Sequence, residues 1–346
     1  MSSAPDISVL IPVLNEAAHI RETVAAMLAQ ELGEMTAELI FVDGRSDDDT
    51  KAILEQLAQE HPSIRVLDNP QRTTAAGLNV ALDAARGRYV ARMDAHSFFP
   101  PEYLAAGVKR LQRGDGVVWV AGPVLARGTG RWSSRVALAL GTRLGVGGSS
   151  KWTSNKDGTP VQEFDLDTGV FAGVWERATV VDLGGWDSDW PVNQDSEMAA
   201  RVLARGGRIV CLPEMAAHYL PRDDLRALWR QYWRHGFYRA KTSSRHPQSL
   251  RRTHLLPPAI VVAVVVAVLA PRPLRRAAHA GLALYLAILG VTTAEAARHA
   301  PARAAVGVPP VLVTMHLAWG LGFMTGWARF GGVGAVAREM LRRRSR

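Results

Sequence analysis

The sequence is almost without cysteine, since Cys211 is the only one in 346 residues. A single cysteine excludes an intramolecular disulfide and cannot alone form a thiolate metal site, and this usage fits a reducing compartment. Cys211 belongs to the apolar run RIVCLP, so we interpret it as a small core residue.

A secretory signal and the glycine-rich phosphate motifs are also missing. The start, MSSAPDISVLIPVLNE, has a short apolar part and soon becomes acidic, unlike a signal peptide. Neither G-x-G-x-x-G nor G-x-x-x-x-G-K-[ST] follows the first apolar run. We therefore expect a cytoplasmic N-terminal part without a Rossmann dinucleotide site or a P-loop.

Charge and apolar residues are unevenly distributed along the chain. The formal charge is +9, and residues 222–252 hold nine Lys or Arg against two Asp. Long apolar stretches follow this basic region directly, which favours a membrane surface as its partner over nucleic acid. They cover residues 255–270, 277–294 and 304–327.

The apolar stretches leave two membrane topologies open. The third can cross ~30 Å of hydrocarbon, whereas the first is short and opens with two prolines. Three crossings would place the tail REMLRRRSR outside, against the positive-inside tendency. A re-entrant or interfacial first stretch would keep Arg272, Arg275, Arg276 and the tail cytoplasmic. We favour this second arrangement, although Arg298 and Arg303 argue against it.

The first hundred residues alternate short apolar runs with stretches of helical period. We expect strands at 7–15, 37–44, 64–69 and 88–96, with helices at 16–32, 51–61 and 74–86 between them. This alternation predicts a parallel sheet covered by helices, with the ligand site beyond the carboxyl ends of the strands. The polar residues expected to converge there are Asn15, Glu16, Asp43, Asp94 and His96.

The rest of the chain is less regular. We expect one strand at 116–126, a mixed region at 127–165, a helix at 193–207 and a strand at 208–213. Residues 222–241 read as a helix with aromatic side chains among arginines, either interfacial or packed on a core.

Asp94 and His96 end the fourth strand with a carboxylate and an imidazole two residues apart. Alternate residues at the end of a strand can turn to the same side, and this pair suits Mn²⁺ or Mg²⁺ holding a diphosphate. His218 is a further candidate metal ligand, although a buried structural histidine is the simpler interpretation.

Several motifs, in this order, resemble glycosyltransferase family 2 with its GT-A fold, and within it the succinoglycan-type (ExoA-like) membrane glucosyltransferases of bacteria. They are VLIPVLNE, IFVDGRSDDDT, NPQRTTAAGLNVALDAARGRYVARMDAH, GGWD, NQDSEMAARV and RQYWRHGFYR, and they extend over residues 6–245. The resemblance implies a Rossmann-like mixed sheet with helices on both faces. We therefore expect a GT-A domain at 1–221, a basic aromatic interfacial region at 222–254, a membrane region at 255–330 and a basic tail at 331–346.

The resemblance also implies roles for individual residues. The expected nucleotide-binding residues are Pro12, Asn15, Glu16, Asp43, Arg72 and Asp94, and the expected metal ligands are Asp94 and His96. His96 stands where the family has Asp. Asp195 matches the general base, and Gln231, Arg234 and His235 resemble the acceptor and diphosphate signature Gln-x-x-Arg-Trp. Arg234 would neutralise the leaving diphosphate.

Simpler interpretations remain beside some of these roles. Asp43 would then be a turn residue, Asp195 a helix cap, and Arg234 a contact of lipid or solvent.

The implied activity is inverting transfer of a sugar, glucose from UDP-glucose, to a hydroxyl of a polyprenyl-diphosphate-linked glycan. It would occur at the cytoplasmic face of the inner (plasma) membrane, in exopolysaccharide or cell-envelope glycan synthesis, with Mn²⁺ or Mg²⁺. A polyprenyl-phosphate glycosyl synthase, a processive synthase and a non-catalytic sugar-nucleotide-binding protein are alternatives. The oligomeric state is left open, and no nucleic-acid partner is expected.

Overall fold

The computed structural model describes residues 4–147, 149, 162–331 and 334. The chain divides into two compact units. Unit 1 comprises Met1–Leu125 and Thr153–Tyr219, and unit 2 comprises Ala126–Trp152 and Leu220–Arg346. Residues 126–152 therefore group with the C-terminal part of the chain.

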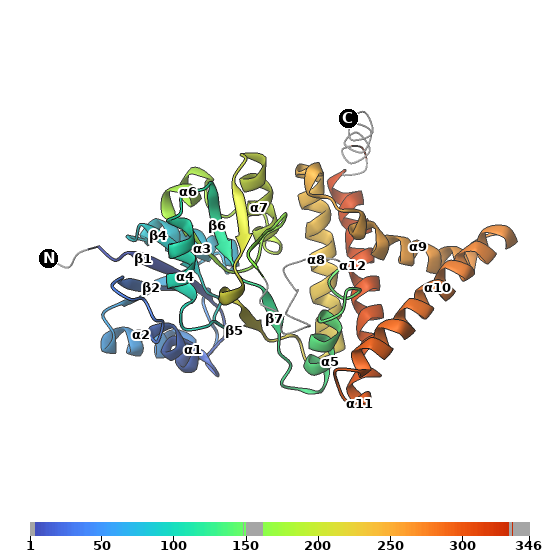
Figure 1. Cartoon of the computed structure of the whole chain (residues 1–346), viewed down its shortest axis with the longest axis horizontal. Helices are drawn as coiled ribbons and strands as arrows, with labels where there is room; N and C mark the ends of the chain where they lie inside the picture. Colours follow the sequence, from blue (N-terminus) through green and yellow to red (C-terminus); the bar gives the residue numbers. More distant parts are fainter. Residues whose placement is uncertain (1–3, 148, 150–161, 332–333, 335–346) are drawn as a thin grey trace. The chain divides into compact units, whose positions relative to one another are not determined.

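Unit 1 is built on a mixed sheet with helices on both faces (Figure 1), in the strand order β3-β2-β1-β4-β9-β6-β10-β8. Its strands are β1 (Ile7–Val13), β2 (Ala37–Asp43), β3 (Ile64–Asp68), β4 (Tyr89–Arg92), β6 (Val117–Ala121), β8 (Phe164–Asp165), β9 (Gly173–Glu176) and β10 (Arg208–Cys211). Its helices are α1 (Ile20–Leu28), α2 (Thr50–Glu60), α3 (Thr74–Ala84), α4 (Tyr103–Leu111), α6 (Arg177–Asp182) and α7 (Gln194–Ala204).

The first four large-sheet strands confirm the alternation that the sequence predicts. β1 pairs in parallel with both β2 and β4, and β2 with β3. The strands β1 and β2 are near-continuous apolar runs because both faces of the sheet are covered there. Beyond these strands β9 runs antiparallel between β4 and β6, which confirms the mixed sheet that the family resemblance implies.

The expected single strand at 116–126 is interrupted. A Cβ atom on Gly122 would lie 1.7 Å from the backbone oxygen of Met215, so the chain passes too close for any other residue. The strand β6 ends at Ala121, and β7 (Val124–Ala126) joins a second sheet in the order β5-β11-β7. The other strands of this small sheet are β5 (Ser97–Phe98) and β11 (Ala217–Tyr219).

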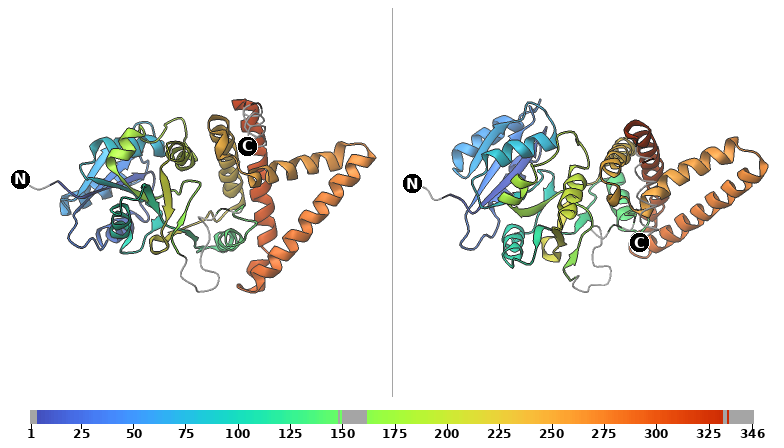
Figure 2. Two further views of the ribbon diagram at one scale, coloured as in Figure 1. Left: turned by 45° about the horizontal axis from the view of Figure 1, so that its top comes forward. Right: turned by 90° about the horizontal axis from the view of Figure 1, so that it is seen from above.

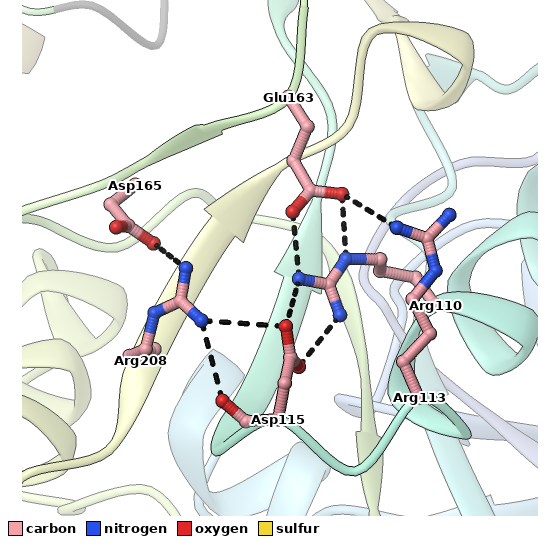
Figure 3. Close-up of polar contacts among 6 residues, drawn as sticks. All are labelled: Arg110, Arg113, Asp115, Glu163, Asp165 and Arg208. Atoms are coloured by element: carbon pink, nitrogen blue, oxygen red, sulfur yellow. Dashed lines mark hydrogen bonds and ion pairs between the residues drawn. The ribbon is translucent and has the colours of Figure 1, made fainter.

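A network of ion pairs connects the elements at the β8 edge of the large sheet (Figure 3). The side chain of Arg110, at the end of α4, is 2% exposed and pairs with Glu163 at 2.6 Å and Asp115 at 2.9 Å. Arg208 on β10 in turn binds Asp115 and Asp165. These pairs tie the edge strand β8 to α4 and β10, although the two-residue strand has few ladder hydrogen bonds of its own.

Unit 2 is helical. It contains α5 (Arg131–Leu140), α8 (Leu225–Arg245), α9 (Leu256–Leu269), α10 (Arg272–Ala297), α11 (Ala302–Ala305) and α12 (Val308–Phe330). The helix α5 lies inside the region expected to be mixed. Asp223 holds its first turn, accepting hydrogen bonds from the backbone N–H groups of Trp132 and Ser133 at 2.6 Å. Asp224 caps α8 in the same way.

Three helical stretches of unit 2 are long and apolar enough to cross a membrane. They are Arg252–Leu269, Arg272–Ala297 and Ala302–Phe330. The predicted stretches 255–270, 277–294 and 304–327 lie on these helices, and α10 begins five residues earlier than predicted. Figure 2 shows α9 and α10 as a hairpin joined at residues 270–271.

Candidate active site

The ends of β1 and β2 form the first part of the candidate site. Val13 and Asp43 are paired in register, so the loops that follow start side by side. Asp43 is 1% exposed and accepts hydrogen bonds from Ser46 N at 3.1 Å and Ser46 Oγ at 2.6 Å. This is the turn role that a simpler interpretation of Asp43 anticipates.

Asn15 connects the two loops in both directions. Its N–H donates to Ser46 Oγ at 2.9 Å, and its Oδ1 accepts from Asp47 N at 2.8 Å. Asn15 and Arg45 both have φ +57°, a left-handed conformation that asparagine tolerates better than most residues. Such strained backbone clusters at binding sites.

A carboxylate and an arginine extend this framework. Asp48 accepts from the hydroxyl of Thr50 at 2.5 Å and from Ala17 N at 3.1 Å, and these hydrogen bonds lower the pKa of its carboxyl. Arg72, with φ +56°, donates to Asp47 Oδ2 at 2.9 Å. Pro12 packs closely on α3, since a Cβ at Gly77 would lie 3.3 Å from Pro12 Cβ.

Asp94 follows β4 and is bound by Arg92. Arg92 Nε donates to Asp94 Oδ1 at 2.8 Å, and Arg92 Nη2 donates to Oδ2 at 2.9 Å. Both side chains are buried, and Arg92 Nη1 has no hydrogen-bond partner among the described residues. The two residues alternate along the chain and so project to the same side. The sequence prediction missed Arg92, although this spacing was visible.

The side chains of His96, after β4, and Glu16, after β1, lie close together. His96 Nδ1 is 3.4 Å from Glu16 Oε1, and the imidazole is half exposed. The pairing of β5 with β11 places His218 opposite Phe98, two residues beyond His96. The Nδ1 atom of His218 is buried without a hydrogen-bond partner in the part of the chain that the structure describes.

The donor set for a divalent cation is sparse. Across residues 4–147, 149, 162–331 and 334, no three His, Cys, Asp or Glu side chains form a group that could hold a metal. Mg²⁺, however, is often bound by one or two protein ligands together with substrate phosphates. Asp94 and His96 therefore fit a cation that a bound diphosphate also coordinates, and do not fit a preformed metal cage.

Asp195 is the second residue of α7, in the first helical turn. The cap position belongs to Asn193 instead, which has φ +63°, so the interpretation of Asp195 as a helix cap is wrong. The backbone of Gly169 lies against the backbone of Asp195, since a Cβ on Gly169 would be 2.2 Å from the Asp195 backbone oxygen. Asp195 is partly exposed, and the helix dipole favours a carboxylate at this end.

The neighbouring acid Glu197 is committed to structure. It is fully buried and accepts from Arg201 Nη2 at 2.8 Å. Arg201 also donates to the backbone oxygens of Leu183 and Gly185, and so attaches α7 to the GGWD loop. Glu197 therefore supports the position of α7 and the GGWD loop.

Asn79 on α3 holds the same loop from the other side. Its Nδ2 donates to the Trp186 backbone oxygen at 2.7 Å, and its Oδ1 accepts from Trp186 N at 2.8 Å. The prediction missed Asn79, yet it ends the motif RTTAAGLN, which was the available signal.

The remaining predicted site residues belong to unit 2. Gln231, Arg234 and His235 lie on α8, where Arg234 is exposed and His235 stacks with Tyr232 at 5.7 Å between ring centroids.

Comparison with known proteins agrees with this arrangement. The family described as "Glycosyl transferase family 2" matches residues 8–170. The chain is 31% identical over 326 residues to the succinoglycan biosynthesis protein ExoA of Rhizobium meliloti, covering 91% of this chain and 93% of the relative. It is 22% identical over 231 residues, 65% of this chain and 70% of the relative, to a dolichyl N-acetyl-α-D-glucosaminyl phosphate 3-β-D-2,3-diacetamido-2,3-dideoxy-β-D-glucuronosyltransferase of Methanococcus voltae.

A solved structure has the same fold. The mannosyltransferase PcManGT from Pyrobaculum calidifontis, in complex with GDP-Man and Mn²⁺, superposes with a TM-score of 0.59 at 19% identity. The match covers 94% of this chain and 88% of that one. The identity over most of both chains in the bacterial relative, together with the GT-A architecture, establishes that the chain belongs to glycosyltransferase family 2.

Proposed function

We propose that the chain is a metal-dependent inverting glycosyltransferase that passes a sugar from a nucleotide donor to a hydroxyl of a lipid-linked glycan. The observation that carries this proposal is Asp195, a partly exposed carboxylate in the first turn of α7, beside Glu197, which Arg201 occupies. Family membership supplies the reaction class.

The nucleotide is proposed to bind over the joined loops after β1 and β2. Asn15 and Ser46 fix these loops to each other. Asp43, Glu16, Arg72 and Pro12 would line the base and ribose region, although Asp43 already serves the turn. Asp94 and His96 would hold Mn²⁺ or Mg²⁺ against the diphosphate, with His218 as a further candidate ligand. When bound, the cation neutralises charge that develops on the leaving diphosphate.

Asp195 is proposed to act as the general base. Inverting transfer requires that the acceptor hydroxyl lose its proton as its oxygen attacks the anomeric carbon from the face opposite the leaving group. The bond to the diphosphate oxygen breaks in the same displacement, and the proton passes to the Asp195 carboxylate. Arg234, with Gln231 and His235 near it on α8, is the proposed cation for the departing diphosphate.

A lipid-linked acceptor is favoured by two observations. Three helices among the described residues could cross a membrane, and the Methanococcus relative is named for a dolichyl-phosphate-linked sugar acceptor. We further propose UDP-glucose as the donor and the cytoplasmic face of the plasma membrane as the place of transfer. A role in exopolysaccharide or cell-envelope glycan synthesis is supported by the likeness to a protein named for succinoglycan biosynthesis.

The experiment is a transfer assay with the detergent-solubilised full chain. It would offer UDP-glucose, other UDP-sugars and GDP-mannose in turn, with a bacterial lipid extract and Mn²⁺ or Mg²⁺. We expect label from one nucleotide sugar to enter the lipid fraction. Nucleotide binding without transfer from any donor would favour the non-catalytic alternative, and transfer onto polyprenyl phosphate alone would favour the polyprenyl-phosphate synthase.

A further inference from the structure

The third apolar helix, α12, is covered largely by its own chain. Within its most apolar 18-residue window, 50% of the residues are buried, against 11% for each of the other two candidate spans. Buried positions recur along its whole length, from Val308 through Met315 to Gly326. A helix that crossed the bilayer as an outer span would present more of this surface to lipid.

The helix α8 packs against α12 at backbone distance. A Cβ on Gly322 of α12 would lie 2.0 Å from the Trp233 oxygen, and one on Gly236 of α8 would lie 2.1 Å from the Trp319 oxygen. A Cβ on Gly326 would likewise lie 2.6 Å from the Phe237 backbone oxygen. Small residues on both helices therefore allow a close, extended contact along the C-terminal half of α12. Figures 1 and 2 show the two helices side by side.

The charge of α8 opposes immersion of this pair in hydrocarbon. Between Leu225 and Arg245, α8 has six Lys or Arg and no acid. Each such charge is costly at the centre of a bilayer. Since α8 lies against residues 319–330, this half of α12 stays at the membrane surface with it.

The start of α12 is also bound to a polar helix. A Cβ on Gly307 would lie 2.2 Å from the Arg135 side chain, and Arg135 Nη2 donates to the Arg303 backbone oxygen at 3.4 Å. Arg135 belongs to α5, whose first turn is also bound by Asp223, just before α8. Each end of α12 thus contacts a helix that carries arginine, while its middle also meets the hairpin at Pro257 and Tyr285.

The α9–α10 hairpin has the opposite character. It projects away from the α8–α12 pair (Figures 1 and 2), and its apolar side chains are exposed, with Val268 at 71% and Leu269 at 78%. Charged residues bracket each arm: the helical stretch Arg252–Leu269, which ends in α9, is 18 residues or about 27 Å long, and Arg276 and Glu295 lie about 28 Å apart along α10. Both lengths match the ~30 Å hydrocarbon layer.

We propose that the α9–α10 hairpin alone crosses the membrane, and that α12 lies at the surface with α8 and keeps the C-terminus on the side of the catalytic unit. The partner of the hairpin is the lipid bilayer. Its tip, with Arg272, Arg275 and Arg276, emerges on the far side, because three arginines would be costly within the hydrocarbon. This topology differs from three crossings and from a re-entrant first stretch.

The arginine distribution supports this topology over three crossings. With two crossings, three arginines at the tip lie on the far side, whereas Arg298, Arg303, Arg329 and the five arginines of residues 338–346 lie on the catalytic side. Three crossings would move Arg329 and those five to the far side, against the positive-inside tendency.

Single cysteines labelled in membrane vesicles test the proposal. Cys211 is buried, and burial raises the pKa of its thiol to about 12, so the native chain serves as the unlabelled control. Cysteines replace Ala270 at the tip, Pro301 between α10 and α12, and Gly334 beyond α12, with Glu60→Cys on α2 as the catalytic-side reference. A membrane-impermeant maleimide is applied to sealed right-side-out and inside-out vesicles.

The labelling pattern separates all three topologies without requiring activity. We expect positions 60, 301 and 334 on one side and position 270 on the other. Positions 270 and 334 both opposite to position 60 would mean three crossings and overturn the proposal. Position 301 alone on the far side would mean a re-entrant first stretch and overturn it equally. Matched labelling in permeabilised vesicles verifies that each cysteine is reactive in the assembled chain.

Discussion

Arg92 and Asp94 form a buried bidentate pair, with both carboxylate oxygens of Asp94 accepting from one guanidinium at 2.8 and 2.9 Å. The side chains are 4% and 11% exposed. The carboxylate of Asp94, the proposed cation ligand, is therefore fixed in orientation and paired with a positive charge.

Removal of one partner of this pair should destabilise unit 1. Arg92→Gln leaves the Asp94 charge buried without its partner, which typically costs about 3–5 kcal/mol. Thermal unfolding of the purified chain would measure the loss. The matched control is Arg88→Gln, whose pair with Glu176 is exposed, and we expect a change below about 1 kcal/mol there. Equal losses of stability in the two variants would show that the buried Arg92–Asp94 pair stabilises the fold no more than an exposed ion pair does.

The network around Arg110 predicts an acid-sensitive edge of the sheet. Hydrogen bonds from Arg110 lower the pKa of Asp115 to about 2 and also lower the pKa of Glu163. Because folding lowers these values, the unfolded chain binds more protons at acid pH. The contribution of the network is complete above about pH 4.5 and is lost as the pH falls towards about 2.

Glu163→Gln tests this pH dependence through unfolding curves between pH 7 and pH 3. The variant should be less stable than the native chain at pH 7, with a difference that shrinks as the pH falls. Glu34→Gln, a change of the same kind at an exposed loop position, should leave the curve unaltered. A stability difference for Glu163→Gln that stays constant with pH would contradict the ion-pair explanation.

Close packing of α8 on α12 predicts unequal effects of two identical substitutions. Gly322→Ala places a methyl group 2.0 Å from the Trp233 oxygen, so the helices must move apart. Gly281→Ala on α10 meets no atom within 4 Å. We expect a lower thermal midpoint for the first variant, with a loss of at least about 1 kcal/mol, and no loss for the second. Equal midpoints would mean that the two helices are not in backbone contact.

Metal dependence predicts a specific effect at His96. Chelation with EDTA should abolish transfer, and His96→Ala should raise the Mn²⁺ concentration that restores half-maximal activity by about 10-fold or more. His61→Ala, at the end of α2, is the control and should leave that concentration unchanged. Full activity of the native chain in EDTA would contradict the proposed metal role.

Much of the fold of unit 1 could be predicted from the sequence, because the apolar runs of β1 to β4 and the helices between them are local patterns. It could not predict that β9 enters between β4 and β6, since strand order depends on contacts distant in sequence. The grouping of α5 with the C-terminal helices was invisible for the same reason. Its link to α8, through Asp223, joins residues about ninety positions apart.

The candidate site divides in the same way. Asn15, Asp43, Asp94 and Asp195 could be named because they follow strands or begin a helix in recognisable motifs. The residues that position them were harder to predict. Arg201 binds Glu197 and the backbone of the GGWD loop, and contacts with backbone oxygens cannot be recognised in a sequence. Only the i,i+4 spacing of Glu197 and Arg201 indicated their pairing.

The central claim is that Asp195 is the general base of a sugar transfer. The most direct test measures the rate of transfer at saturating donor and acceptor for Asp195→Asn, beside the exposed Asp182→Asn on α6, with nucleotide binding followed separately. We expect Asp195→Asn to bind nucleotide normally and to transfer about 10²–10⁴-fold more slowly, while Asp182→Asn transfers at the native rate. Native transfer by Asp195→Asn would contradict the account.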